Sequence, residues 1–308
     1  MLIRTKFLLA GILFCSVSYS QIKITLRKSF IDSFKNKVTI DADYAIFYAH
    51  PSPNAAKDDG DLHFSGYDKK IGLPTVAEVM NAADEQEALD TIHANEGKGK
   101  PDNTITLTGV WRLWAEHIST GTTYAQGMGS KTIKNTNPNH VFEIHPATSI
   151  KGIDLISSLR DIEGYEAEPK KAFPNYLSRP CNISSTTKKI TIQTRGALYN
   201  YADFWIRLLS TEKFKVDDGL FVYCDVLDAK FKPGVHNVSS KTITFMIRMA
   251  FVKGSEAYNT VKDMQKDEFL HVIAIPRISL IAISQRVSSK KNLSDKLPFE
   301  MIVVGIKE

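Results

Sequence analysis

Two short segments of the chain each place a carboxylate and an imidazole two residues apart. Asp61 and His63 form one pair, and Glu143 and His145 form the other. Residues at i and i+2 of a β-strand point to the same face, so each pair presents its side chains together. Imidazole nitrogens and carboxylate oxygens bind Zn²⁺ and similar ions, and an open coordination position can activate a water. One interpretation is therefore a metal site formed by His63, His145, Asp61 and Glu143.

The same residues also have a structural interpretation. Carboxylate–imidazole pairs form buried polar networks that hold strands and loops in place. Asp59-Gly60-Asp61 is a turn signal in its own right. The sequence contains no HExxH, CxxC or DxDxDG spacing to support a metal. We therefore expect no cofactor, keep a divalent metal as the alternative, and expect at least one pair to be structural.

Signals for nucleophilic or phosphate-transfer chemistry are missing from the sequence. There is no GxSxG motif, and no glycine-rich phosphate loop follows a predicted strand. Neither Cys181 nor Cys224 has a flanking catalytic motif. The sequence thus favours a non-catalytic protein.

The elements that must position the paired residues follow a recognisable order. Within residues 37–150, alternating apolar and polar residues predict strands, and one segment rich in helix formers predicts a helix. The order strand, strand, strand, helix, strand, strand is that of the OB-fold, a five-stranded barrel. The predicted strands are 38–50, 61–67, 73–81, 104–117 and 141–150, and the helix is 82–95.

A similar order returns in the second half of the chain. Residues 151–189 are predicted to be a short helix (151–162) and an irregular linker. Residues 190–308 then form a second OB-like β domain, so the fold class is mainly β with two tandem OB-fold-like domains. One larger mixed β-structure over 190–308 is the alternative. The predicted strands are 189–194 with 201–209, 220–227, 242–253, 269–287 (one strand, or two broken at Pro276) and 299–306, with a helix at 255–266.

Four short motifs resemble a pattern found in small exported bacterial proteins with an OB-like order of elements. The motifs are D-G-D-L-H at 59–63, V-A-E at 76–78, L-T-G at 107–109 and E-I-H-P at 143–146. The resemblance covers residues 40–150, and the family has no assigned activity. It implies one polar constellation of Asp61, His63, Glu78, Glu143 and His145.

The first predicted barrel also carries aromatic and basic residues suited to ligand binding. Trp111 and Trp114 lie three residues apart on the fourth strand and face opposite sides, and Arg112 shares a face with Trp114. OB-folds bind single-stranded nucleic acids or sugars through one barrel face and the loops after the first and fourth strands. Here those loops are 51–60 and 119–139, and the second adds Tyr124 and Lys131. The alternative is that both tryptophans belong to the core.

The first twenty residues have the features of a secretory signal. Arg4 and Lys6 precede an apolar run, and small residues before Gln21 predict cleavage between Ser20 and Gln21. No later apolar segment reaches membrane-spanning length, so we expect an exported protein, periplasmic or secreted, without a transmembrane anchor. In that compartment Cys181 and Cys224 could form a disulfide or remain separate thiols.

Charge and composition leave three functions open. Lys and Arg total 39 against 34 Asp and Glu, a net charge of +5 without a basic block, so weak attraction to polyanions is allowed but not required. We expect a binding protein whose OB-like barrel holds an oligosaccharide, a peptide or a nucleic acid. The alternatives are a metal-dependent hydrolase of phosphodiesterase or nuclease type, and an envelope component that binds a protein partner.

Overall fold

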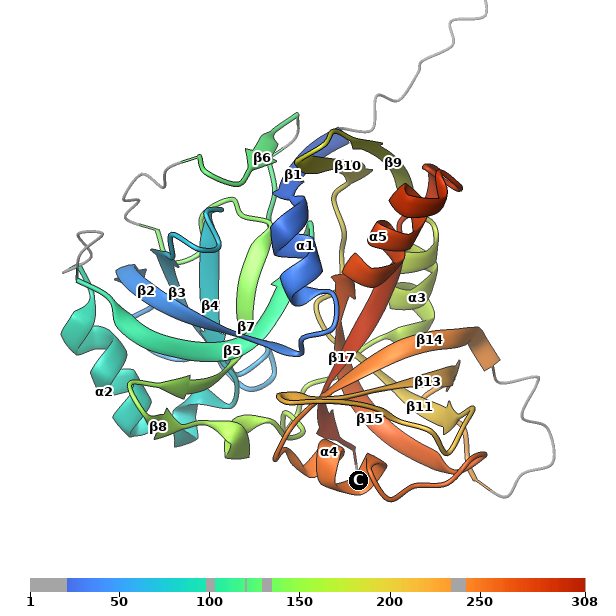
Figure 1. Cartoon of the computed structure of the whole chain (residues 1–308). Coiled ribbons are helices and arrows are strands. Elements are labelled where there is room, and N and C mark those ends of the chain that lie inside the picture. The colour runs from blue at the N-terminus through green and yellow to red at the C-terminus, as the bar shows by residue number, and fades with distance from the viewer. Residues whose placement is uncertain (1–20, 98–102, 120, 129–134, 234–241, 308) are drawn as a thin grey trace, which may run out of the picture.

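The structure is a computed structural model that describes residues 21–97, 103–119, 121–128, 135–233 and 242–307 (Figure 1). These residues form two closed five-stranded barrels and a third sheet. The fold is mainly β with two OB-like barrels, as predicted.

The first barrel closes in the strand order of an OB-fold. Its sheet runs β4-β3-β2-β5-β7, and a parallel pairing of β4 with β7 closes it. A 3₁₀ turn (Ala82–Asp84) and α2 (Gln86–Asn95) connect β4 to β5, where the sequence predicted the helix. Its strands are β2 (Thr39–Ala49), β3 (Leu62–Tyr67), β4 (Thr75–Val79), β5 (Ile105–Leu113) and β7 (Phe142–Ile150).

The second barrel repeats this order. Its sheet runs β11-β15-β17-β14-β13, the pairing of β11 with β13 closes it, and β14 and β17 run parallel. Helix α4 (Glu256–Val261) again connects the third strand to the fourth, and β12 (Phe214–Val216) pairs with the first residues of β13. Its barrel strands are β11 (Ala202–Leu208), β13 (Gly219–Leu227), β14 (Thr242–Val252), β15 (Phe269–Ile278) and β17 (Phe299–Ile306).

A third sheet lies across one end of both barrels (Figure 1). Its order is β16-β9-β10-β1-β6. Strand β6 comes from the loop between β5 and β7, and β16 from the corresponding loop between β15 and β17, so the sheet ties the two barrels together. Its strands are β1 (Gln21–Arg27), β6 (Thr123–Ala125), β9 (Pro180–Ser185), β10 (Lys189–Arg195) and β16 (Ser294–Lys296).

Several connecting segments differ from the sequence prediction. Lys151 and Gly152 adopt positive φ, 49° and 85°, and turn the chain into β8 (Ile153–Asp154), so the predicted helix at 151–162 is reduced to a 3₁₀ turn at Ile156–Ser158. The predicted irregular segment 163–189 contains α3 (Pro169–Leu177) and β9.

Two predicted strands of the second half are also corrected. Residues 189–194 form β10 of the third sheet, which leaves β11 alone as the first barrel strand. Residues after Ile278 form α5 (Leu280–Ser289), whose buried Leu280 and Ile283 are three residues apart, a helical spacing.

The cysteines do not pair. Cys181 in β9 and Cys224 in β13 are both buried and both free. None of the helices in the described part of the chain is both long and apolar enough to cross a membrane.

The outer faces of the two barrels pack against each other through an apolar layer. The second barrel contributes alternate residues of its strands, which point away from its own interior. The first barrel and the segment after β8 supply the opposing side. The layer consists of Val38, Met80, Val110, Leu159, Ile162, Tyr201, Phe221, Ala250, Val252, Ile273, Ile275, Ile302 and Val304.

Candidate functional site

The five residues of the predicted polar constellation lie on the outer face of the first barrel. They alternate along β3, β4 and β7 with core residues such as Phe64, Ala77 and Ile144. His63 stands opposite Glu78 in the β3–β4 ladder. The structure thus brings the residues of D-G-D-L-H, V-A-E and E-I-H-P together. All except His63 are fully buried.

His145 occupies the centre of this cluster. Its Nε2 lies 3.2 Å from Asp61 Oδ2, and its Nδ1 lies 3.2 Å from Glu78 Oε2 and 3.5 Å from Glu143 Oε2. Burial lowers the pKa of His145, but Glu78, followed by hydrogen bonds to Asp61 and Glu143, outweighs it and raises the pKa well above its usual value.

Tyr201, immediately before β11 of the second barrel, completes the cluster. Its hydroxyl donates to Asp61 Oδ2 at 2.7 Å and lies 2.7 Å from His145 Nε2. Because the hydroxyl proton goes to Asp61, the Tyr201 oxygen accepts from His145 Nε2–H. Sequence reasoning missed Tyr201, since it lies in another domain and belongs to no spaced motif.

Glu143 is bound by a separate set of groups. Arg112 donates to Glu143 Oε2, and His140 Nε2 lies 3.0 Å from Glu143 Oε1. Burial raises the pKa of Glu143, but the Arg112 guanidinium and the hydrogen bonds from His140 and His145 together hold it well below its usual value. Glu143 therefore acts as the fixed anion of this cluster.

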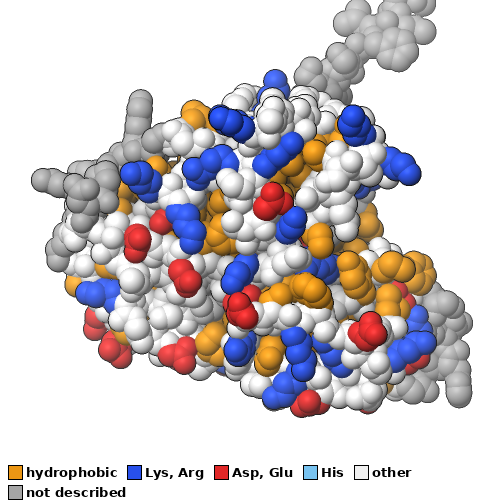
Figure 2. Space-filling model, in the orientation of Figure 1, with side chains coloured by type: hydrophobic (Ala, Val, Ile, Leu, Met, Phe, Trp, Pro, Cys, Tyr) orange, Lys and Arg blue, Asp and Glu red, His pale blue; other side chains and the backbone are white. Residues whose placement is uncertain are grey.

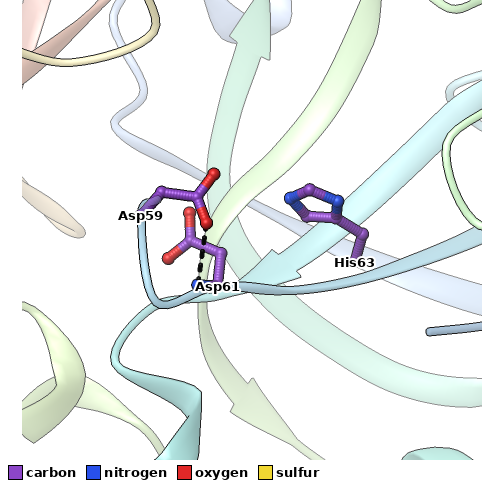
Figure 3. Close-up of side chains that lie close together, drawn as sticks. All are labelled: Asp59, Asp61 and His63. Atoms are coloured by element: carbon purple, nitrogen blue, oxygen red, sulfur yellow. Dashed lines mark hydrogen bonds between the residues drawn. The ribbon is translucent and has the colours of Figure 1, made fainter. Parts of the chain in front are cut away.

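The partly exposed edge of the cluster is formed by His63 and Asp59. Figure 3 shows the His63 ring facing Asp59 and Asp61. The His63 side chain is 15% exposed, and its Nε2 lies 3.5 Å from Glu78 Oε2. Asp59 Oδ1 accepts from the Asp61 backbone N–H at 3.2 Å and from Asn54 at 2.9 Å. Burial lowers the pKa of His63, but Glu78, Asp59 and Asp61 raise it overall.

The residues predicted to bind a ligand on the first barrel are not accessible. Trp111, Arg112, Trp114 and Tyr124 are all buried, so the interpretation of an open aromatic face is wrong. Trp111 stands opposite the core residue Ile144 in the β5–β7 ladder, so it faces the interior of its own barrel. Trp114 packs against Tyr176 of α3, whereas Arg112 contacts the second barrel. Lys131 lies outside the described residues.

Arg112 instead belongs to a duplicated feature at the barrel interface. It stands opposite Glu143 in the β5–β7 ladder, as Arg277 stands opposite Glu300 in the β15–β17 ladder. Each pair joins the fourth and fifth strands of its barrel. Both pairs are buried.

The two arginines also cross the interface reciprocally. Arg112 Nε donates to the Pro276 carbonyl at 3.0 Å, and Arg277 Nη1 donates to the Trp111 carbonyl at 3.1 Å. Pro276 and Trp111 each precede the other arginine in sequence, so the contacts are equivalent. An approximate two-fold axis that passes between their fourth strands therefore relates the two barrels.

This equivalence shows which polar residues the fold itself does not need. With Glu300 matched to Glu143, Ile302 occupies the position of His145. In the ladders of the second barrel, Ile302 stands opposite Ala250, and Ala250 opposite Phe221. The three positions held by His145, Glu78 and His63 in the first barrel are thus apolar in the second.

A second candidate site is an open groove on the second barrel. It has a volume of about 430 Å³, within the range of small-molecule sites. Four elements of the second barrel and one residue after α1 (Lys28–Phe34) line it. The lining residues are Asn36, Ser210, Glu212, Lys213, Phe214, Phe221, Val222, Tyr223, Arg248 and Ile281.

The groove occupies the ligand-binding position of an OB-fold. That position is the face of the second and third strands with the loops after the first and fourth. Here Phe214 comes from β12 in the connection after β11, Tyr223 from β13, Arg248 from β14 and Ile281 from α5 in the connection after β15. Figure 2 shows hydrophobic side chains gathered over the part of the surface where Figure 1 places β14, with Lys and Arg side chains nearby.

Comparisons with known proteins add little to this description. No family model matches the chain, and no curated protein matches it. A solved deletion mutant of the single-stranded DNA binding protein from Thermus aquaticus matches over 88% of this chain and 92% of its own, with 8% identity and a TM-score of 0.22. A similarity that low carries no argument, so the OB-like description rests on strand order and barrel closure.

Proposed function

We propose that this chain is an exported, non-catalytic binding protein that holds an oligosaccharide in the groove of its second barrel. The observation that carries the proposal is the position of the groove, which combines all the elements that OB-folds use for oligomeric ligands. The signal-like first twenty residues support export. The proposal thus places the ligand on the second barrel, whereas the sequence predicted it on the first.

Exposed aromatic rings favour a ligand with flat, apolar ring faces. Phe214 and Tyr223 line the groove and remain 54% and 52% exposed. Exposed apolar side chains that gather in one patch mark interaction sites. Sugar rings and nucleobases both stack on such side chains.

The charges in the groove favour the neutral ligand. Arg248 donates to Glu300 Oε2 at 2.7 Å, and Lys213 donates to the Met264 carbonyl, so both cations already have acceptors within the protein. Glu212 adds a negative charge to the lining. A nucleic acid would need several free cations to neutralise its phosphates.

Titration calorimetry with oligosaccharide fragments and with single-stranded oligonucleotides tests the proposal. We expect oligosaccharide binding that Tyr223→Ala or Phe214→Ala weakens at least tenfold, a loss of about 1.4 kcal/mol of binding free energy, since each variant removes a stacking ring. Tyr48→Ala is the matched control, because Tyr48 is 40% exposed on β2 of the first barrel. Binding of oligonucleotides alone, or oligosaccharide binding unchanged by both groove variants, contradicts the proposal.

A further inference from the structure

Three atoms in the buried cluster of the first barrel have no hydrogen-bond partner among the described residues. They are Asp61 Oδ1, Glu78 Oε2 and His145 Nδ1, one from each of three neighbouring residues. These residues are 1%, 1% and 0% exposed. Each unsatisfied buried polar group costs about 1–3 kcal/mol, and charged groups cost more. His145 Nδ1 and Glu78 Oε2 face each other at 3.2 Å without hydrogen-bond geometry, and a cation bound by all three atoms would satisfy them together.

The hydrogen bonds of Tyr201 determine which ring nitrogen of His145 is available to bind a cation. Tyr201 donates to Asp61 Oδ2 and so accepts from His145 Nε2–H. Metal binding requires the neutral imidazole, so an ion would displace the second ring proton, and Nδ1 then carries the free lone pair. Histidine ligands of metal ions are usually oriented in this way, by a hydrogen bond from the second ring nitrogen.

The charge of the cluster also calls for a cation. Among the described residues, Arg112 is the one arginine in contact with the cluster, and it pairs with both Glu143 and Glu116. Asp61 and Glu78 form ion-pair contacts only with histidines in the described part of the chain. Two buried carboxylates therefore lack a permanently charged partner.

We propose that Asp61, Glu78 and His145 bind a divalent transition-metal ion, with Zn²⁺ the best fit to one imidazole nitrogen and two carboxylate oxygens. These residues each offer a ligand atom within 4.8 Å of the other two. Ligand bonds of about 2.0–2.2 Å require donor atoms within about 4.4 Å, so a small side-chain rotation closes the set. An all-oxygen ion such as Ca²⁺ does not match the imidazole.

Two residues of the metal set that the sequence predicted, Glu143 and His63, are not among the three proposed ligands. Glu143 is excluded, because Arg112 and His140 occupy its oxygens. His63 stands at the exposed edge, 3.5 Å from Glu78 Oε2, and groups with Asp59 and Asp61 rather than with the three buried ligands. Glu78 replaces Glu143 in the ligand set.

The ion has a structural role. The three ligands are fully buried, so no oligomeric substrate reaches the ion and no hydrolytic step is assigned to it. Tyr201 links the ligands to the second barrel, so the ion stabilises the interface. The apolar residues at the equivalent positions of the second barrel show that the OB-like fold forms without such a site.

Native mass spectrometry and metal analysis of the tag-free full chain test the site. We expect one Zn²⁺ per chain, a thermal midpoint that falls by several degrees after dialysis against EDTA, and recovery with Zn²⁺ but not Ca²⁺. Glu78→Gln and His145→Gln should each weaken Zn²⁺ binding at least tenfold. His271→Gln is the matched control, because His271 is paired with Asp203 at 2.9 Å on the second barrel.

Two results overturn the proposal. One is a folded wild-type chain that remains metal-free in excess Zn²⁺, with an unchanged thermal midpoint. The other is Zn²⁺ binding that survives in Glu78→Gln, His145→Gln and Asp61→Asn, which would place the ion elsewhere. If the variants do not fold, the metal content of the wild-type chain in native mass spectrometry and its change in thermal midpoint still test the proposal. Because the groove lies on the other barrel, oligosaccharide binding succeeds or fails independently.

Discussion

At the scale of single residues, burial decides what each charged side chain can do. Glu143, Arg112 and Glu78 lie on strands whose outer faces would be solvated in an isolated barrel, yet all three are buried here. Charges removed from water in this way must be paired or hydrogen-bonded. Glu143 and Arg112 meet this requirement through each other, whereas Glu78 depends on histidines and on the proposed ion.

Replacing Glu143 tests the strength of that pairing. Glu143→Gln should lower the free energy of unfolding by about 2–4 kcal/mol, because Arg112 loses the more buried of its two counter-charges and keeps only Glu116. Denaturant unfolding followed by circular dichroism measures the change. Asp84→Asn is the control, since Asp84 pairs with the half-exposed Arg160 and should cost less than about 1 kcal/mol. Equal effects of both variants would contradict the argument.

At the scale of elements, close backbone packing restricts the strands of the second barrel. Gly219 begins β13, and a Cβ there would lie 2.2 Å from the Phe251 carbonyl oxygen of β14 and 2.8 Å from Val38 Cγ2 of the first barrel. Glycine therefore allows β13 to approach both its neighbouring strand and the other barrel. The position equivalent to Gly219 in the first barrel is Asp61, because His63 matches Phe221.

Substitution of this glycine tests the restriction. Gly219→Ala should destabilise the chain by about 1–3 kcal/mol, because the added methyl meets backbone that cannot move aside. Thermal unfolding provides the measurement. Gly196→Ala is the control, since the nearest atom to its Cβ would be the flexible tip of the Ile118 side chain, at 3.0 Å, and the nearest backbone atom lies 3.7 Å away. A Gly219 variant as stable as the control would show that β13 and β14 separate easily.

At the scale of the whole molecule, the two barrels form one unit. The third sheet takes strands from both halves of the chain, and the interface contains an apolar layer and two buried arginine–glutamate pairs. Arg277 donates to backbone carbonyls of Val38, Trp111 and Lys37 across the interface. We therefore expect the barrels to unfold together.

Arg277→Met tests that coupling. It should cost about 3–5 kcal/mol, because Glu300 loses a partner and three carbonyls lose a donor. Unfolding followed by tryptophan fluorescence and by far-UV circular dichroism should show one shared midpoint in the wild type and a lower one in the variant. Arg160→Met, at a 41% exposed side chain, should change the midpoint little. Separate midpoints in the wild type would show independent barrels.

The sequence alone determined the features that depend on local periodicity. Alternating strands, the helix after the third strand and the repeat of that order predicted both OB-like barrels, because side-chain period and chain order set these elements. The spacing of Asp61 with His63 and of Glu143 with His145 placed each pair on one strand face. The register of the β3–β4 and β4–β7 pairings then places both pairs next to Glu78, as the resemblance implied.

Only the tertiary structure decided which faces are covered and which are open. A period of two shows that residues share a face, but not whether water, the core or another barrel lies against it. Arg112 was therefore assigned to a ligand face that in fact meets the second barrel, and Trp111 and Trp114 to ligand binding although both are core residues. Tyr201 joins the cluster from 140 residues away in sequence. The groove combines four separate segments of the second barrel. Such long-range contacts leave no local pattern, because packing between elements rather than the periodicity within them creates these sites.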